Sequence, residues 1–90
     1  MRRPRVSWMT AADDRILEFL LNEGNQPIVA TPAVVEMNVD YQRTHVNNRL
    51  RKLRDAGLVE YYDEERAAYQ ITDLGRAYLA GEIDADELEK

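Results

Sequence analysis

The apolar residues within 16–20 recur at the spacing of one face of an amphipathic helix, in the segment that follows Thr10. Thr10 is suited to be the N-cap, and Asp13 three residues later fits a variant of the capping box. Gly24 stands where the residue after a helix C-cap belongs. This segment is therefore predicted to form a mostly buried scaffold helix.

A loop and a second, short helix are predicted next. Ile28 and Val29 follow a proline and favour a short extended piece. Thr31 is a suitable N-cap, and Pro32 at the first helical position loses nothing by lacking an N–H group. The helix that starts here is expected to run for roughly six to eight residues before "NVD" interrupts it.

A longer third helix is predicted over about 41–56, with Asp40 as its N-cap and Gly57 just beyond its end. Leu53 and Leu58 are placed as the two apolar residues that accompany a Schellman motif around Gly57. The pattern thus predicts both the end of this helix and the manner in which it ends.

Two strand-like runs, 58–62 and 67–72, flank the polar segment 63–66 and predict a β-hairpin. Thr72 then caps a fourth helix that ends at Gly81. The fold class is therefore mainly α with a small β-hairpin. The order of elements predicts a winged helix-turn-helix with a three-helix core, a wing and a C-terminal helix.

The chain is expected to divide into an N-terminal arm (1–9), a winged helix-turn-helix domain (10–82) and an acidic C-terminal tail (83–90). Within the tail, Asp84 and Glu87 fit a capping box and predict a short last helix. Ninety residues suffice for one independently folding domain.

Charge is distributed unevenly. The chain carries 12 Lys and Arg against 17 Asp and Glu, yet five of the cations and none of the acids fall within 43–54. Such a run is commonly a solvated helix face, but exposed helix faces usually mix both signs. A face without carboxylates instead suits a polyanion.

On a helical wheel the third helix has two distinct sides. Its inner edge carries Val46, Leu50 and Leu53. Its outer side carries Thr44, Asn48 and Arg51. Asn and Gln pair with adenine, Arg pairs with guanine and Thr accepts either, so the outer side has the chemistry that reads base edges.

These residues carry a family resemblance. The pattern is Arg49-Leu50, Leu53, Gly57-Leu58-Val59, a hairpin, and Tyr69-x-Ile71-Thr72-x-x-Gly75. Over about 10–82 the chain resembles the winged helix-turn-helix regulators of archaea and bacteria, in particular the small haloarchaeal repressor-like proteins related to the phage phiH repressor. In this frame Gly75 is expected to allow a close approach to another backbone.

The resemblance implies a small transcriptional regulator, a repressor, that binds double-stranded DNA sequence-specifically with the third helix in the major groove. The residues it implies for DNA contact are Gln42, Arg43, Thr44, His45, Asn47, Asn48, Arg51 and Lys52. The N-terminal half of this set is expected at base edges and the C-terminal half at phosphates.

The wing departs from the family, in which basic residues often occupy the tip. Here the tip is Asp63-Glu64-Glu65 with only Arg66 beside it, so it is expected to turn away from phosphate. The candidate accessory contacts are Arg2, Arg3, Arg5 and Arg66. A frayed, solvated arm is the competing interpretation of the first three.

Composition argues against several other classes. The chain has no cysteine and the single histidine His45, so no thiol nucleophile and no multi-histidine metal site is expected. We expect no enzyme activity, no cofactor, no metal and no small-molecule ligand. No apolar run reaches the length of a membrane span, which favours a cytoplasmic protein. Ten of the 12 cations are Arg, and with the acidic balance this is typical of a halophile or of a GC-rich genome.

Two further hypotheses concern partners. A homodimer is expected, because both chain ends carry apolar residues beyond the needs of one core. The interface candidates are Trp8, Tyr78, Leu79, Ile83 and Leu88. The alternative function is a protein–protein interaction module that uses the acidic wing and tail.

Overall fold

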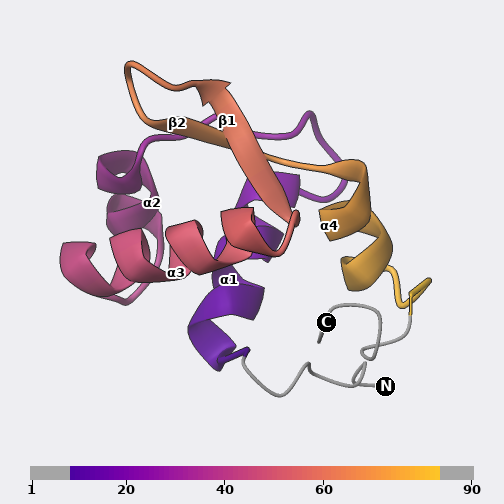
Figure 1. The fold of residues 1–90 in the computed structure, drawn as a ribbon. Helices are drawn as coiled ribbons and strands as arrows, with labels where there is room; N and C mark the ends of the chain where they lie inside the picture. Colours follow the sequence, from indigo (N-terminus) through magenta and orange to yellow (C-terminus); the bar gives the residue numbers. More distant parts are fainter. Residues whose placement is uncertain (1–8, 84–90) are drawn as a thin grey trace.

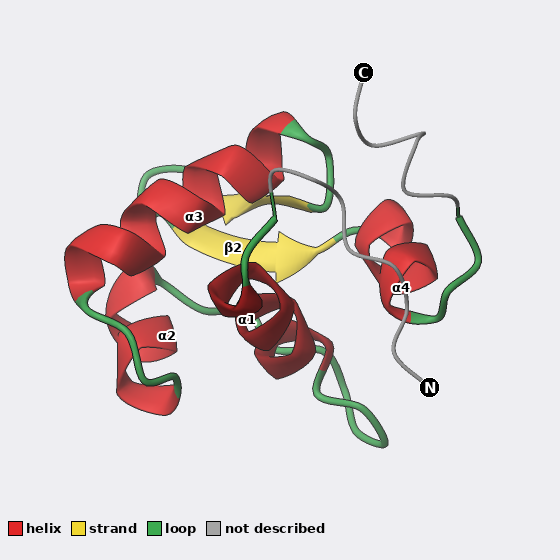
Figure 2. Cartoon of the chain, turned by 90° about the horizontal axis from the view of Figure 1, so that it is seen from below, coloured by secondary structure: helices red, strands yellow, loops and turns green. Residues whose placement is uncertain are grey.

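The computed structural model describes residues 9–83, in which α1 is the central element and contacts α2, α3, α4 and β2. The elements are α1 (Ala11–Leu21), α2 (Pro32–Asn38), α3 (Arg43–Asp55), β1 (Val59–Asp63), β2 (Ala68–Ile71) and α4 (Asp73–Leu79). Figure 1 shows α3 lying across α1, with the hairpin above α3 and α4 to the right. The view from below in Figure 2 places α1 between α3 and α4. The predicted winged helix-turn-helix is confirmed.

Several predictions fall outside the described residues. They concern the arm residues Arg2, Arg3 and Arg5, the apolar anchors Trp8 and Leu88, and the short helix of the tail. Met9, at the edge of the described range, is buried in the hydrophobic core.

The start of α1 agrees with the sequence, and its end does not. The Thr10 N–H donates to Asp13 Oδ2 at 2.8 Å, as the capping box requires. The prediction that Gly24 follows the C-cap is wrong, because Asn22 is already the C-cap, in the left-handed region at φ 50°. Asn tolerates this region since its side chain bonds locally, here from Nδ2 to the Gln26 carbonyl at 2.9 Å.

The predicted cap of α2 is confirmed, since Thr31 Oγ1 accepts from the Val34 N–H at 3.4 Å and Pro32 is the first helical residue. The extended piece before it centres on Ala30 rather than on residues 28–29. Ala30 and Tyr69 exchange two backbone hydrogen bonds of 3.0 and 2.8 Å. The loop before α2 is therefore joined to β2 by an isolated β-bridge.

The third helix starts two residues later than predicted. Its N-cap is Gln42, which has an extended backbone and makes no side-chain cap bond, so the prediction of Asp40 as cap is wrong. A carboxylate from α2 caps the helix instead, because Glu36 Oε2 accepts the Arg43 backbone N–H at 3.0 Å. An acidic group at this end is also favoured by the helix dipole.

The end of α3 is the predicted Schellman motif. The Leu58 N–H donates to the Leu53 carbonyl at 2.9 Å, and the Gly57 N–H donates to the Arg54 carbonyl at 2.9 Å. Gly57 has φ 82°, which a residue with a side chain rarely adopts. The chain thereby turns directly from α3 into β1.

The hairpin pairs Val59 with Ile71 and Tyr61 with Tyr69 in antiparallel register. A bulge at Tyr62 shifts the register, so that Asp63 faces Ala68. The turn occupies residues 64–67, one residue beyond the predicted 63–66. Tyr69 and Ile71 are buried, as expected for the strand that covers the core.

The start of α4 lies very close to the turn at Gly57 and Leu58 that leads from α3 into β1. Thr72 Oγ1 accepts from the Gly75 N–H at 3.1 Å and donates to the Gly57 carbonyl at 2.6 Å. A Cβ on Gly75 would lie 2.3 Å from the Leu58 carbonyl oxygen. The predicted need for glycine at position 75 is confirmed, since no side chain fits there.

One of the proposed interface residues belongs to the core. Tyr78 is only 3% exposed, and its hydroxyl donates to Asp14 Oδ1 at 2.9 Å. It therefore offers no surface to a second copy, and its prediction as an interface anchor is wrong. Leu79 and Ile83 are partly buried and pack at the edge of the core.

The contact at Gly75 predicts a destabilising Gly75→Ala substitution. In an ordinary helix this change stabilises by about 0.5–1 kcal/mol. Here the added methyl meets a backbone oxygen, so we expect a loss of roughly 1–3 kcal/mol in the free energy of unfolding. Urea denaturation followed by circular dichroism measures it, and a gain in stability would contradict the close approach of α4 to the Leu58 carbonyl.

Candidate nucleic-acid interface

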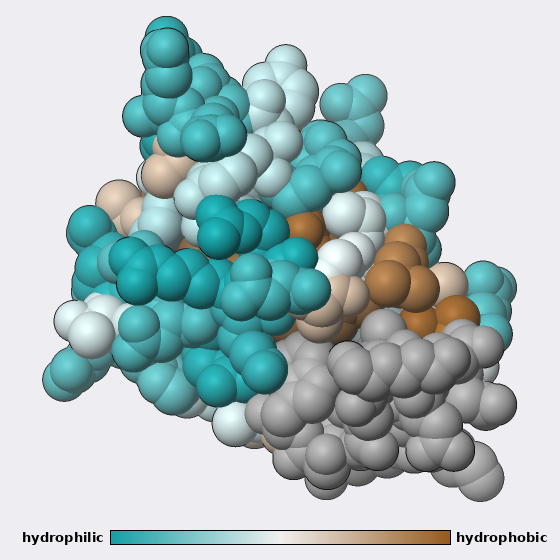
Figure 3. Space-filling view, in the orientation of Figure 1, coloured by the Kyte–Doolittle hydropathy of each residue, from teal (hydrophilic) through white to brown (hydrophobic). Residues whose placement is uncertain are grey.

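The third helix separates a buried edge from an exposed side. Val46, Leu50 and Leu53 are all 0% exposed and pack into the core. Thr44, Asn48 and Arg51, on the opposite side, are all exposed. Figure 3 shows continuous hydrophilic surface over α3 on the face turned to the viewer. The helical wheel therefore predicted the orientation of α3 correctly.

The structure brings the predicted contact residues together along this exposed side. Exposed are Gln42, Arg43, Thr44, His45, Asn48, Arg51 and Lys52, and Asn47 is half-buried. Gln42 lies at the N-cap rather than within the helix. The His45 ring packs against the Tyr41 ring, with the ring centroids 5.5 Å apart. This contact restricts the orientation of the imidazole at the N-terminal end of α3.

Of the five cations of 43–54, four form two groups along α3, and the fifth, Arg54, contacts the hairpin. Two of them pair with carboxylates on other helices: Arg43 with Glu36 of α2, and Arg49 with Asp13 of α1. Arg51 and Lys52 are exposed in the C-terminal half of the helix. The N-terminal half therefore presents mainly neutral hydrogen-bonding groups, and the C-terminal half presents charge.

The Arg49–Asp13 pair is structural. Arg49 donates from Nε to Asp13 Oδ1 at 2.8 Å and from Nη2 to Oδ2 at 2.7 Å, a bidentate arrangement. The Asp13 side chain is fully buried and that of Arg49 is 19% exposed. The hydrogen bond to Asp13 outweighs the opposing effect of burial and raises the pKa of Arg49, which stays charged.

Sequence reasoning did not single out this pair, although one signal existed. At about 100° per residue, Arg49 falls next to Leu53 on the wheel, at the margin of the buried edge. A cation in that position needs a carboxylate partner. The sequence could not name that partner, because Asp13 lies 36 residues away.

The C-terminal end of α3 is joined to the hairpin by aromatic contacts. The Arg54 guanidinium lies 5.0 Å from the centre of the Tyr61 ring. The rings of Tyr61 and Tyr69 are 4.7 Å apart, and the Tyr69 hydroxyl donates to that of Tyr61 at 3.3 Å. Burial, and next the hydrogen bond to Tyr61, raises the pKa of Tyr69 from 10.0 to about 12.

At the tip of the wing, the cation Arg66 pairs with a neighbouring carboxylate. The Arg66 N–H donates to Asp63 Oδ1 at 3.3 Å, and its Nε lies 3.6 Å from Asp63 Oδ2. Glu64 and Glu65 are exposed at the same turn. The tip is therefore acidic in the structure as well as in the sequence.

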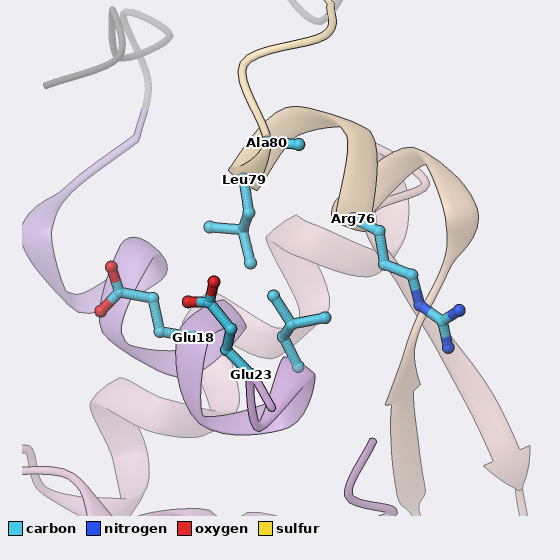
Figure 4. Close-up of a pocket in the computed structure, with 6 residues that line it drawn as sticks. Glu18, Glu23, Arg76, Leu79 and Ala80 are labelled. Atoms are coloured by element: carbon cyan, nitrogen blue, oxygen red, sulfur yellow. The ribbon is translucent and has the colours of Figure 1, made fainter. Parts of the chain in front are cut away.

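A shallow hollow of about 330 Å³ lies away from α3, between the C-terminal ends of α1 and α4. Figure 4 shows Glu18 and Glu23 on the α1 side, with Leu79 pointing into the space. Across residues 9–83, no three His, Cys, Asp or Glu side chains are grouped to hold a metal ion. No helix in that range is long and apolar enough to cross a membrane.

The buried ion pair predicts a large effect of Arg49→Met. The substitution leaves the Asp13 carboxylate buried without its cation, which costs about 3–5 kcal/mol of folding free energy. Arg51→Met on the exposed side of the same helix is the matched control, expected within about 0.5 kcal/mol of the parent chain. Urea denaturation compares them, and equal effects would show that the pair does not hold α3 in place.

The raised pKa of Tyr69 predicts alkaline destabilisation. Between pH 10 and pH 12 the tyrosine of the unfolded chain loses its proton while the folded chain keeps it. Stability should therefore fall as the pH rises, by up to about 1.4 kcal/mol per pH unit from this group. Tyr69→Phe should remove that part of the slope, whereas Tyr62→Phe, at an exposed ring, should not. Denaturant titrations across this pH range measure both variants.

Comparison with known proteins agrees with this geometry. A family model described as "Winged helix-turn-helix phage repressor" matches residues 1–90. The chain is 39% identical over 87 residues to the repressor protein of Halobacterium phage phiH, covering 96% of each chain. It is also similar to the crystal structure of the PhiH1 repressor-like protein from Haloarcula marismortui, with a TM-score of 0.78, 38% identity, and coverage of 94% of this chain and 92% of that one. The chain belongs to the winged helix-turn-helix phage repressor family.

Proposed function

We propose that this protein is a transcriptional repressor that binds double-stranded DNA sequence-specifically, with α3 in the major groove. The observation that carries the proposal is the two-sided build of α3. Val46, Leu50 and Leu53 hold one side in the core, and the opposite side is polar and exposed. A helix held in this way can enter a groove about 12 Å wide without disturbing the fold.

The chemistry along α3 suits two tasks. Thr44, Asn47 and Asn48 offer hydroxyl and amide groups to base edges near the N-terminal half of the helix. Arg51 and Lys52 offer charge to phosphates near the C-terminal half. Base contacts specify the sequence and phosphate contacts set the position on the duplex, so the division supports specific binding.

The wing takes little part in this proposal. Its exposed Glu64 and Glu65 would repel phosphate, and Arg66 is drawn onto Asp63. The carboxylates of the wing tip are therefore expected to turn away from the DNA backbone. Arg66, and the arm residues Arg2, Arg3 and Arg5, are secondary candidates for contact.

High salt weakens the attraction of a single copy for DNA, which makes a dimer important. At about 1 M salt the Debye length is ~3 Å, so attraction at a distance is largely lost. The haloarchaeal origin of the relatives makes such salt relevant to this chain. We therefore include in the proposal a homodimer on half-sites about 34 Å apart, in which two modest contacts add up. Leu79 and Ile83 remain the described candidates for its interface.

The double variant Asn48→Ala with Arg51→Ala should keep the fold and lose specific DNA binding. Both side chains are exposed, so folding is expected to change by no more than about 0.5 kcal/mol for each. The control is Asn25→Ala with Arg76→Ala, the same residue types exposed elsewhere on the chain. Fluorescence anisotropy against a duplex selected from a random library measures binding.

Unchanged DNA binding in the α3 variant would sink the proposal. A protein–protein adaptor would behave differently from a repressor in the same experiment. Its partner would be retained by the α3 variant, and the parent chain would enrich no sequence from the library.

A further inference from the structure

The ion pair between α2 and α3 fixes one arginine at the reading end of the helix. Arg43 Nε donates to Glu36 Oε1 at 2.8 Å, and the Arg43 backbone N–H donates to Glu36 Oε2 at 3.0 Å. One carboxylate thus holds both the first residue of α3 and its side chain. The side-chain bond uses Nε as its donor, so it does not engage the two terminal nitrogens of the guanidinium.

The pair lies where base contacts are made. Arg43 is the first residue of α3, beside Gln42 and Thr44, and its side chain is 51% exposed. The N-terminal residues of a recognition helix are the ones that meet base edges. Terminal nitrogens of an arginine can donate together to O6 and N7 of guanine.

The charge of the pair also favours a base over a phosphate. A carboxylate 2.8 Å from the guanidinium cancels most of its net charge, while the N–H donors remain. A phosphate would be repelled by Glu36, which is itself 34% exposed. The edge of guanine carries no net charge, so it accepts the same donors without that repulsion.

We propose that Glu36 and Arg43 form a unit that reads guanine, in which Glu36 is a positioning residue and Arg43 determines specificity. This inference rests on the proposed function of α3 as a major-groove reader. Exposed ion pairs contribute little to stability, so the bond to the guanidinium adds little to the fold beyond the cap that Glu36 already provides to the Arg43 N–H. A neutral reading unit also adds specificity that salt screens only weakly, since few counterions are released on binding.

Three variants of the full chain test the unit: Arg43→Ala, Glu36→Gln and Arg51→Ala. Gln keeps an oxygen that can accept the Arg43 N–H, so the start of α3 is preserved. Each protein selects duplexes from a random library. Anisotropy titrations across KCl concentrations then give the affinity and its salt slope for the selected duplex and for a scrambled one.

Arg43→Ala should abolish a guanine preference at one position of each half-site. Discrimination at that position should fall roughly 10- to 100-fold, and the salt slope should stay as in the parent chain. Glu36→Gln should weaken the same preference and steepen the slope on scrambled DNA by up to about 0.9, because Arg43 then acts as an unpaired cation. Arg51→Ala, the comparator for a phosphate contact, should flatten the slope by about 0.9 and leave the selected motif intact.

The opposite pattern overturns the inference. If Arg43→Ala keeps every motif position and flattens the slope as Arg51→Ala does, then Arg43 is a phosphate contact. If Glu36→Gln changes neither preference nor slope, Glu36 does not position it. In both cases specific binding by the parent chain leaves the proposed function standing. If the parent chain enriches no sequence, the proposed function fails and this inference fails with it.

Discussion

The ion pair between Asp13 and Arg49 sets how α3 is turned about its own axis. The apolar edge alone would tolerate some rotation, because aliphatic side chains pack without directional bonds. A bidentate bond to a fully buried carboxylate allows much less. Asp13 is held in turn by the Thr10 N–H, and the next residue, Asp14, accepts the Tyr78 hydroxyl. The first turn of α1 thus connects α3 and α4, and the direction in which α3 faces follows from it.

The basic stretch 43–54 therefore does not act as one patch. Arg49 supports the frame, Arg54 stacks on Tyr61 of the wing, and Arg43 is matched with Glu36. A broad field of charge contributes little to binding where salt screens it strongly. The contacts of cations with defined partners at short range remain favourable in high salt, since close contacts are screened less than distant ones.

The sequence predicted the features that depend on neighbouring residues. The caps at Thr31 and Thr72 and the turn at Gly57 follow from bonds made within three to five residues. The outward side of α3 followed from helical periodicity. The start of α3 and the partners of its cations did not, because Glu36 acts seven residues from Arg43 and Asp13 acts 36 residues from Arg49. Such contacts depend on the angle between helices, which periodicity does not give.

The isolated β-bridge at Ala30 links two parts of the fold. Its two hydrogen bonds to Tyr69 tie the segment leading into α2 to the returning strand of the wing. Glu36 is carried by α2 and accepts hydrogen bonds from Arg43, so this backbone link connects the wing to the residue that holds the start of α3. Under the proposed function, a molecule that binds the acidic hairpin would therefore act on the start of α3 without covering the exposed side of that helix.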